Sequence, residues 1–274
     1  MLNRSFIPSA RAMSLDEVRR TAPSIFADAP HSKLSERYTL IPTGRVLEAL
    51  EHEGFVPTRV MQARVRNGNG IGYAKHLVRL RHRDQLGRPA AVDAIVPEVV
   101  LVNSHDGSSS YQLHAGLYRF VCSNGMVVAD GCIGSLSIRH TGKVVDEVID
   151  GVYEVVHETP KLIERVGEYR GTRVSDGEAL VLANAALELK YEPGRAPIAP
   201  EQLIVPRRTE DHGADLWSRI NVVQENLFRG GLRGRSASGR RMHTRAVASV
   251  TDDVRLNKAL WRLADEFARL KSAH

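Results

Sequence analysis

Alternation between apolar and charged residues in the middle third of the chain constrains the fold more than any other feature. Within residues 61–66 the apolar Met, Ala and Val alternate with Gln62, Arg64 and Arg66. A period of two is typical of a β-strand, because successive side chains point to opposite faces of the sheet. This stretch therefore predicts a strand with one apolar and one basic face.

A second stretch, residues 73–83, repeats the pattern: Arg79, Arg81 and Arg83 alternate with apolar residues. The sequence Asn-Gly-Asn-Gly at 67–70 stands between the two stretches and predicts a tight hairpin turn. Strand-like segments continue at 90–103, 109–122 and 126–140, with connections too short for parallel crossovers. We therefore expect an antiparallel sheet.

Helical signals flank this predicted sheet. Ser14 with Glu17, and Ser175 with Glu178, have the spacing of a capping box at the start of a helix. Apolar residues at helical spacing predict helices at 43–54, with Thr43 as N-cap, at 143–166, with a bend or end at Pro160, and at 178–191, 214–228 and 252–270.

These patterns predict an α+β fold: an antiparallel β-sheet core packed by long helices, followed by a helical C-terminal region. We expect a helical N-terminal arm at 1–38, an α+β sheet core at 39–192, a proline-rich, linker-like segment at 193–202, and a helical region at 203–274 that carries an arginine-rich loop. The last region either stands apart or packs on the core as one domain.

Composition narrows the class of protein. With 274 residues, 42% hydrophobic and 26% charged, the chain is typical of a globular protein rather than a disordered one. No apolar run approaches the roughly 18 residues of a membrane span, and the first residues lack a secretory signal, so we expect a cytoplasmic protein with no membrane partner. Cys122 and Cys132 stand alone, which favours reduced thiols over a disulfide framework or zinc site.

The distribution of positive charge indicates what kind of partner the protein binds. The net charge is +6, and residues 229–245 hold six arginines and no acidic residue. Glycine and serine between these arginines let the backbone follow a partner, and guanidinium groups bind phosphate oxygens bidentately. We therefore predict a nucleic-acid-binding surface made of Arg64, Arg66, Arg79, Arg81, Arg83, Arg229, Arg233, Arg235, Arg240, Arg241 and Arg245. The alternative is a solvated basic loop.

An enzyme is a weaker interpretation. Cys122 as nucleophile needs His105 or His114 as base, but His105 and Cys122 lie near opposite ends of a predicted strand, about 50 Å apart at ~3.3 Å per residue. Cysteine is also among the most buried residue types. A metal site of His105, Asp106 and His114 meets the same difficulty, so we predict no catalytic residue, metal or cofactor.

Three blocks of sequence resemble a known family. Asn103-Ser104-His105-Asp106-Gly107, a block containing Arg119, Cys122, Asn124 and Gly125, and residues 221–226 occur in that order. With them the chain resembles the phage- and plasmid-related family known as domain of unknown function 932. The resemblance implies a mobile-element context but no reaction. The order of elements also resembles the core of single-strand annealing proteins, a likeness of architecture only.

We accordingly predict a mobile-element protein that binds single-stranded DNA or another nucleic acid, in recombination or annealing, and that forms homo-oligomers. The first alternative is a non-catalytic protein-interaction, anti-defence or regulatory factor. The second is a nuclease or thiol-dependent enzyme. Asp106-Gly107 and Asn124-Gly125 are predicted to be turns at the two ends of a long strand, with a structural rather than chemical role.

Overall fold

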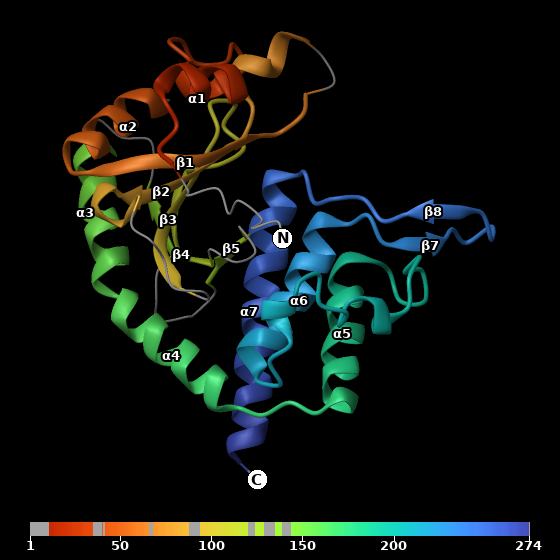
Figure 1. The fold of residues 1–274 in the computed structure, drawn as a ribbon. Coiled ribbons are helices and arrows are strands. Elements are labelled where there is room, and N and C mark those ends of the chain that lie inside the picture. Colours follow the sequence, from red (N-terminus) through yellow and green to blue (C-terminus); the bar gives the residue numbers. More distant parts are fainter. Residues whose placement is uncertain are drawn as a thin grey trace, which may run out of the picture. The chain divides into compact units, whose positions relative to one another are not determined.

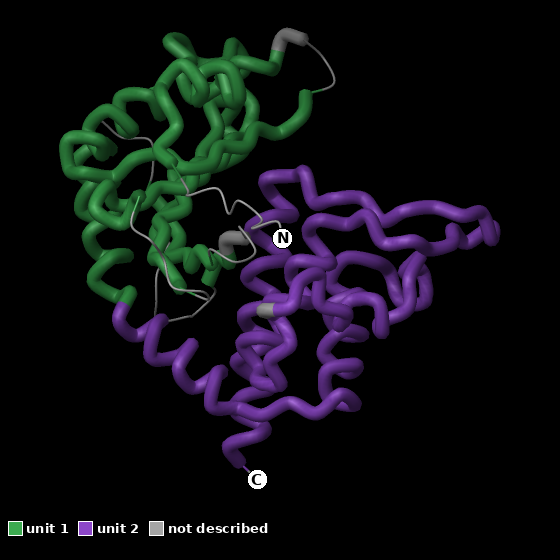
Figure 2. The backbone as a smooth tube through the Cα atoms, in the orientation of Figure 1, with its two compact units in different colours: residues 1–159 green, residues 160–274 purple. Residues whose placement is uncertain are grey.

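The computed structural model describes residues 11–34, 40, 42–65, 68–87, 94–119, 124–128, 135–138 and 144–273. The chain divides into two compact units, residues 1–159 and 160–274 (Figure 2). This division differs from the expected one, because the predicted linker at 193–202 lies inside the second unit. Leu203, which follows that segment directly, is fully buried, and the amide of Arg235 donates a hydrogen bond of 2.8 Å to the Pro197 carbonyl.

An antiparallel sheet forms the centre of the first unit and confirms the predicted fold class (Figure 1). Within the described residues its strands are β1 (Phe55–Gln62), β2 (His76–His82), β3 (Ile95–Asn103), β4 (Tyr111–Arg119), β5 (Asn124–Val127) and β6 (Ser135–Ile138). The first five pair in sequence order, and β6 also pairs with β4. Strands β5 and β6 share one edge of β4: β5 pairs with its second half and β6 with its first.

Helices α1 (Leu15–Thr21), α2 (Thr43–His52) and α3 (Val144–His157) belong to the same unit. Helix α3, green in Figure 1, packs on β3, β4 and β6, and α2 packs on β1 and on α3. Gly151 allows the close approach of α3, since a Cβ there would lie 2.7 Å from Leu113 Cδ1. Helix α3 ends at His157 and the next helix begins at Thr159, which confirms the predicted break at Pro160.

The second unit contains α4 (Thr159–Gly171), α5 (Asp176–Lys190), α6 (Leu216–Arg229), β7 (Arg233–Arg235), β8 (Arg241–His243) and α7 (Val250–Ser272). Helices α5, α6 and α7 pack against one another around the buried Trp217 and Trp261. Strands β7 and β8 form a hairpin that projects beyond these helices (Figure 1). Both predicted capping boxes are present. None of the helices in the described ranges is long and apolar enough to span a bilayer.

The predicted turns have different outcomes. Asp106-Gly107 is a turn: Gly107 has φ +78°, and the amide of Ser108 donates to Asp106 Oδ1 at 2.9 Å. The tight Asn-Gly turn between the first two strands is wrong, because a 3-10 helix over Gly68–Tyr73 lies between β1 and β2. Asn124-Gly125 is also not a turn, since it begins β5, with Asn124 paired to Arg119.

Candidate nucleic-acid interface

The first block of the family resemblance contributes to a buried polar cluster around Thr43. Thr43 Oγ1 accepts a hydrogen bond from Asn103 Nδ2 at 3.1 Å. The same oxygen lies 2.9 Å from His76 Nε2 and 3.3 Å from both His105 Nε2 and Tyr111 Oη. All five side chains are fully buried. Thr43 was predicted to be the N-cap of α2, but Pro42 takes that position, and the threonine hydroxyl serves the cluster instead.

The imidazole of His76 is held neutral in this cluster. Burial, followed by the neighbouring His105, lowers the pKa of His76 to about 3. Its Nδ1 lies 2.9 Å from Ser24 Oγ, which in turn donates to Gln62 Oε1 at 2.8 Å. A neutral histidine surrounded by hydroxyl and amide groups, away from solvent, stabilises a fold rather than activating a substrate.

The remaining residues of the resemblance are dispersed. Ser104 lies on the turn, where it accepts a hydrogen bond from Ser108 Oγ at 3.2 Å. Arg119 is buried at the end of β4, paired with Asn124 of β5. Cys122 and Cys132 lie outside the described residues, so the structure places neither thiol. In the described part of the chain, no three His, Cys, Asp or Glu side chains gather as a metal site would require.

The predicted basic face of the sheet needs correction at Arg79 and Arg81. Arg79 Nη1 lies 3.1 Å and Arg81 Nε 2.7 Å from opposite oxygens of Glu98, and the exposed fractions of the two arginine side chains are 1% and 3%. The Arg81 guanidinium also stacks 3.4 Å from the centroid of the Tyr118 ring. Because Glu98 on β3 and Tyr118 on β4 already engage these guanidinium groups, Arg79 and Arg81 form an internal ion cluster.

The other predicted sheet arginines are not part of that cluster. Arg83 is exposed and lies 3.3 Å from Glu51 of α2. Arg64 is exposed beyond the end of β1, and Arg66 lies outside the described residues. Of the four predicted sheet arginines that the structure describes, two are therefore buried in an ion cluster and two are exposed.

The arginine-rich segment, in contrast, is an ordered hairpin with two different faces. In the β7–β8 register Arg233 is opposite His243, Gly234 is opposite Met242, and Arg235 is opposite Arg241. Directly opposed residues lie on the same face. Arg233, Arg235, Arg241 and His243 therefore share one face, hereafter the basic face, and all four are exposed.

The opposite face of the hairpin packs against the protein. A Cβ on Gly234 would lie 2.1 Å from the Pro197 carbonyl oxygen and 2.9 Å from Ile198 Cγ2. The amide of the next residue, Arg235, donates to the same carbonyl. Glycine at 234 thus allows the strand to approach the 197–198 segment, which fixes the orientation of the basic face.

The arginines of the basic face have no acidic partner in the part of the chain that the structure describes. Within the described ranges, no carboxylate lies within 4 Å of the guanidinium groups of Arg233, Arg235, Arg241, Arg240 or Arg245. Arg229 differs, since its Nη1 lies 3.2 Å from Glu225. Residues 233–245 therefore form an exposed cationic surface whose arginines have no acidic partner among the described residues.

The third block of the resemblance, at 221–226, anchors the start of the hairpin. Asn226 donates to the carbonyls of Leu203 and Val205 at 2.8 and 2.9 Å. It accepts a hydrogen bond of 2.7 Å from Arg207 Nε, and the same guanidinium donates to the Gly230 carbonyl at 2.7 Å. The buried Glu225 pairs with Arg208 as well as Arg229. These polar side chains of α6 fix the residues from which β7 departs.

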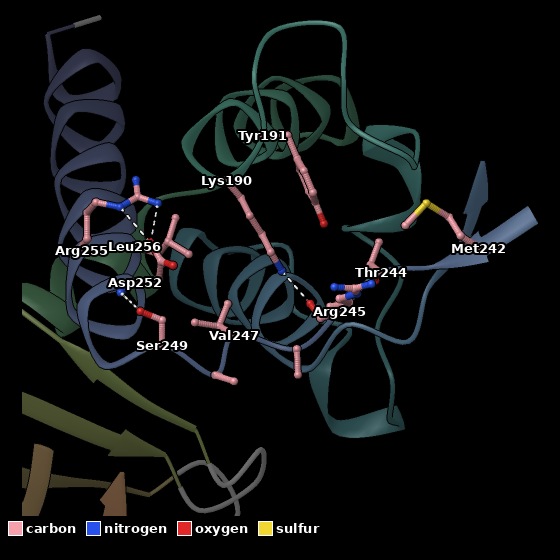
Figure 3. A pocket seen from close by; sticks show the side chains of 12 residues that line it. Lys190, Tyr191, Met242, Thr244, Arg245, Val247, Ser249, Asp252, Arg255 and Leu256 are labelled. Atoms are coloured by element: carbon pink, nitrogen blue, oxygen red, sulfur yellow. Dashed lines mark hydrogen bonds and ion pairs between the residues drawn. The ribbon is translucent and has the colours of Figure 1, made fainter. Parts of the chain in front are cut away.

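A pocket of about 340 Å³ adjoins the hairpin. Its walls come from the end of α5, the segment after β8 and the start of α7 (Figure 3). Lys190 Nζ donates to the carbonyls of Leu227 and Arg245 at 2.7 and 2.9 Å, and burial lowers the pKa of Lys190. Sequence analysis placed neither Lys190 nor Tyr191 in a site, because the sequence of a helix end does not show which distant segments form a pocket beside it.

Fold and surface together define an α+β protein with a sheet unit and a helical unit that carries a basic hairpin. Residues 30–261 match the model of a family described as domain of unknown function, DUF932. The chain belongs to this family.

Two relatives come from Escherichia coli strain K12. The UPF0380 protein YafZ is 40% identical over 255 residues, which are 93% of this chain and 91% of the relative. The UPF0380 protein YfjQ is 41% identical over 259 residues, with the same two shares. No solved structure matches the chain. Family membership thus confirms the predicted resemblance and supplies no activity.

Proposed function

We propose that the protein binds nucleic acid through the basic face of the β7–β8 hairpin. The observation that carries the proposal is the direct pairing of Arg235 with Arg241 across two short exposed strands, with no carboxylate of the described residues within 4 Å of either guanidinium group. Like charges directly opposed in a sheet are destabilising, by roughly 0.2–1 kcal/mol. A two-stranded hairpin is itself marginal. Phosphate groups between the guanidinium groups remove the repulsion and accept charge-assisted hydrogen bonds.

Further arginines extend this surface along the chain. Arg240 lies beside the hairpin turn, and Arg245 follows β8 in an exposed position. A row of arginines on one ordered element suits a repeating anion such as a phosphate backbone, which releases counterions when it is neutralised. The ion-paired Arg79 and Arg81 have no part in this proposal.

The proposal includes single-stranded nucleic acid as the preferred ligand, and a role in a mobile element, where recombination exposes single strands. The order of elements, which resembles that of single-strand annealing proteins, supports this part. Self-association stays a prediction, which light scattering after size-exclusion chromatography tests.

Fluorescence anisotropy with labelled single-stranded and duplex oligonucleotides, over a series of salt concentrations, tests the proposal. The informative variant replaces Arg233, Arg235 and Arg241 by serine. A matched control replaces three exposed arginines elsewhere in the unit, Arg195, Arg262 and Arg269, so that both variants lose the same net charge.

We expect the hairpin variant to flatten the slope of log K against log salt by about 2–3, because three phosphate contacts contribute roughly 0.7–0.9 each. The control variant should retain most of the slope. Equal losses in the two variants, or no binding by the unaltered protein, would refute the proposal. A protein partner that is retained after nuclease treatment, without direct oligonucleotide binding, would favour the protein-interaction alternative.

A further inference from the structure

The pocket beside the hairpin combines surfaces of two kinds. Met242, Val247 and Leu256 provide apolar walls, and the half-buried ring of Tyr191 also lines the pocket (Figure 3). Lys190 and Arg245 contribute positive charge. A ligand that complements this lining has a flat, weakly polar part and an anionic part.

The one acidic residue of the pocket lining neutralises only part of its positive charge. Asp252 is the carboxylate of the lining, and its Oδ1 already lies 3.1 Å from Arg255 Nη2. The Lys190 ammonium carries three N–H donors, of which two serve the carbonyls of Leu227 and Arg245. One donor and a half-buried positive charge thus remain for an anion, 5.6 Å from the centroid of the Tyr191 ring.

The hairpin connects this pocket to the basic face. Met242 lies on β8 between Arg241 and His243, so its side chain points away from the basic face and lines the pocket. Thr244 and Arg245 continue from β8 along the pocket wall. A nucleic-acid strand whose phosphates contact Arg241 therefore lies next to the pocket, because the following residue, Met242, is part of the pocket lining.

We propose that this pocket takes one unpaired nucleotide of a strand bound on the basic face. Its base packs against the Tyr191 ring and Leu256, and its phosphate pairs with Lys190 and Arg245. The volume of about 340 Å³ falls at the lower end of ligand pockets, which span about 300–1,000 Å³. A base inside a duplex is stacked and paired, and it cannot enter without being flipped out.

This inference rests on the proposed function and adds its selectivity: the pocket, rather than the arginines, distinguishes single strands from duplexes. Aromatic stacking tolerates every base, because each base has a π-face. The preference should therefore be largely independent of sequence.

Substitution of Tyr191 tests the pocket. Tyr191→Leu keeps apolar bulk and removes the aromatic face, while the matched variant Tyr191→Phe keeps the ring. We expect Tyr191→Leu to weaken single-strand binding about tenfold, the scale of one stacked base, and to leave duplex binding unchanged. Tyr191→Phe should bind as the unaltered protein does. Thermal unfolding of both variants shows whether the fold is intact.

The outcomes separate this inference from the proposed function. Equal effects of Tyr191→Leu on single strands and duplexes, or no effect on either, would overturn the pocket and leave the basic face standing. In that case the variant of Arg233, Arg235 and Arg241 should still lose binding, which shows that the basic face binds nucleic acid without the pocket. In a second measurement, calorimetric titration with a nucleoside monophosphate should give heat that Tyr191→Leu reduces. Absence of this heat with the unaltered protein also counts against the pocket.

Discussion

Replacement of Thr43 by valine tests the buried cluster most directly. Valine has nearly the shape of threonine but lacks the hydroxyl that four polar atoms of neighbouring side chains approach within 3.3 Å. A hydroxyl donates one hydrogen bond and accepts two, so it serves at most three of these groups at once. The substitution therefore leaves two or three buried polar groups without one of their partners.

The expected loss of stability follows from these contacts. A hydrogen bond lost by a buried group that keeps its other partners costs about 1 kcal/mol, within a range of roughly 0.5–1.5, and the extra buried methyl of valine returns about 1 kcal/mol. With three hydrogen bonds lost, the Thr43→Val variant should lose about 2 kcal/mol of unfolding free energy. Thr43→Ser, which keeps the hydroxyl and loses a methyl, should lose about 1 kcal/mol.

Denaturant unfolding followed by two probes measures this loss. The two tryptophans, Trp217 and Trp261, both lie in the second unit, whereas Thr43 lies in the first. Circular dichroism follows both units, and tryptophan fluorescence follows the second. The reasoning fails if Thr43→Val is as stable as the unaltered protein, or more stable than Thr43→Ser, because an apolar site gives that order.

Three further results are expected. The pKa of His76 is about 3 in the folded protein and about 6.5 in the unfolded chain, so protons bind the unfolded state preferentially. The unfolding free energy should therefore fall by about 2 kcal/mol from pH 7 to pH 5. In the His76→Gln variant this fall should be smaller. Gly234→Ala should destabilise the hairpin by about 1–3 kcal/mol, because its Cβ meets the Pro197 carbonyl, and faster amide hydrogen exchange in β7 would show it. Arg241→Thr should slow that exchange and weaken oligonucleotide binding, because it removes the repulsion opposite Arg235 together with a phosphate contact.

Local physical rules account for much of the fold. Ser14 and Ser175 cap their helices as the Ser-x-x-Glu spacing predicts, because both partners lie within one turn of the chain. Asp106-Gly107 turns for an equally local reason, since the aspartate side chain bonds the amide two residues on. The antiparallel sheet follows from period-two alternation and short connections.

Features that depend on distant residues escaped prediction. Alternation places Arg79 and Arg81 on one face, but their pairing with Glu98 depends on the position of β3 beside β2. The role of Thr43 depends on where β2, β3 and β4 bring His76, Asn103 and Tyr111. A hydroxyl near a helix start gives the same sequence signal whether it caps the helix or serves another cluster.

The candidate site shows the same limit at the hairpin. Arginine and glycine in residues 229–245 predict an anion-binding segment from composition alone, and they resemble a flexible loop. The glycine at 234 instead marks a close contact with the 197–198 segment, which sequence analysis assigned to a linker. Only the pairing of β7 with β8 shows which arginines share a face.

Recognition of the family and inference of function therefore rest on different residues. Asn103 and His105 belong to a buried cluster, and Asn226 anchors loops, so these residues identify the fold through contacts in the protein interior. The arginines of the basic face are exposed, and their arrangement stabilises the hairpin poorly unless an anion is bound. A relative that keeps the buried residues without such arginines should share the fold and fail to bind nucleic acid at this face. The proposed nucleic-acid binding consequently has to be tested at the hairpin of each member and is not transferred with the family match.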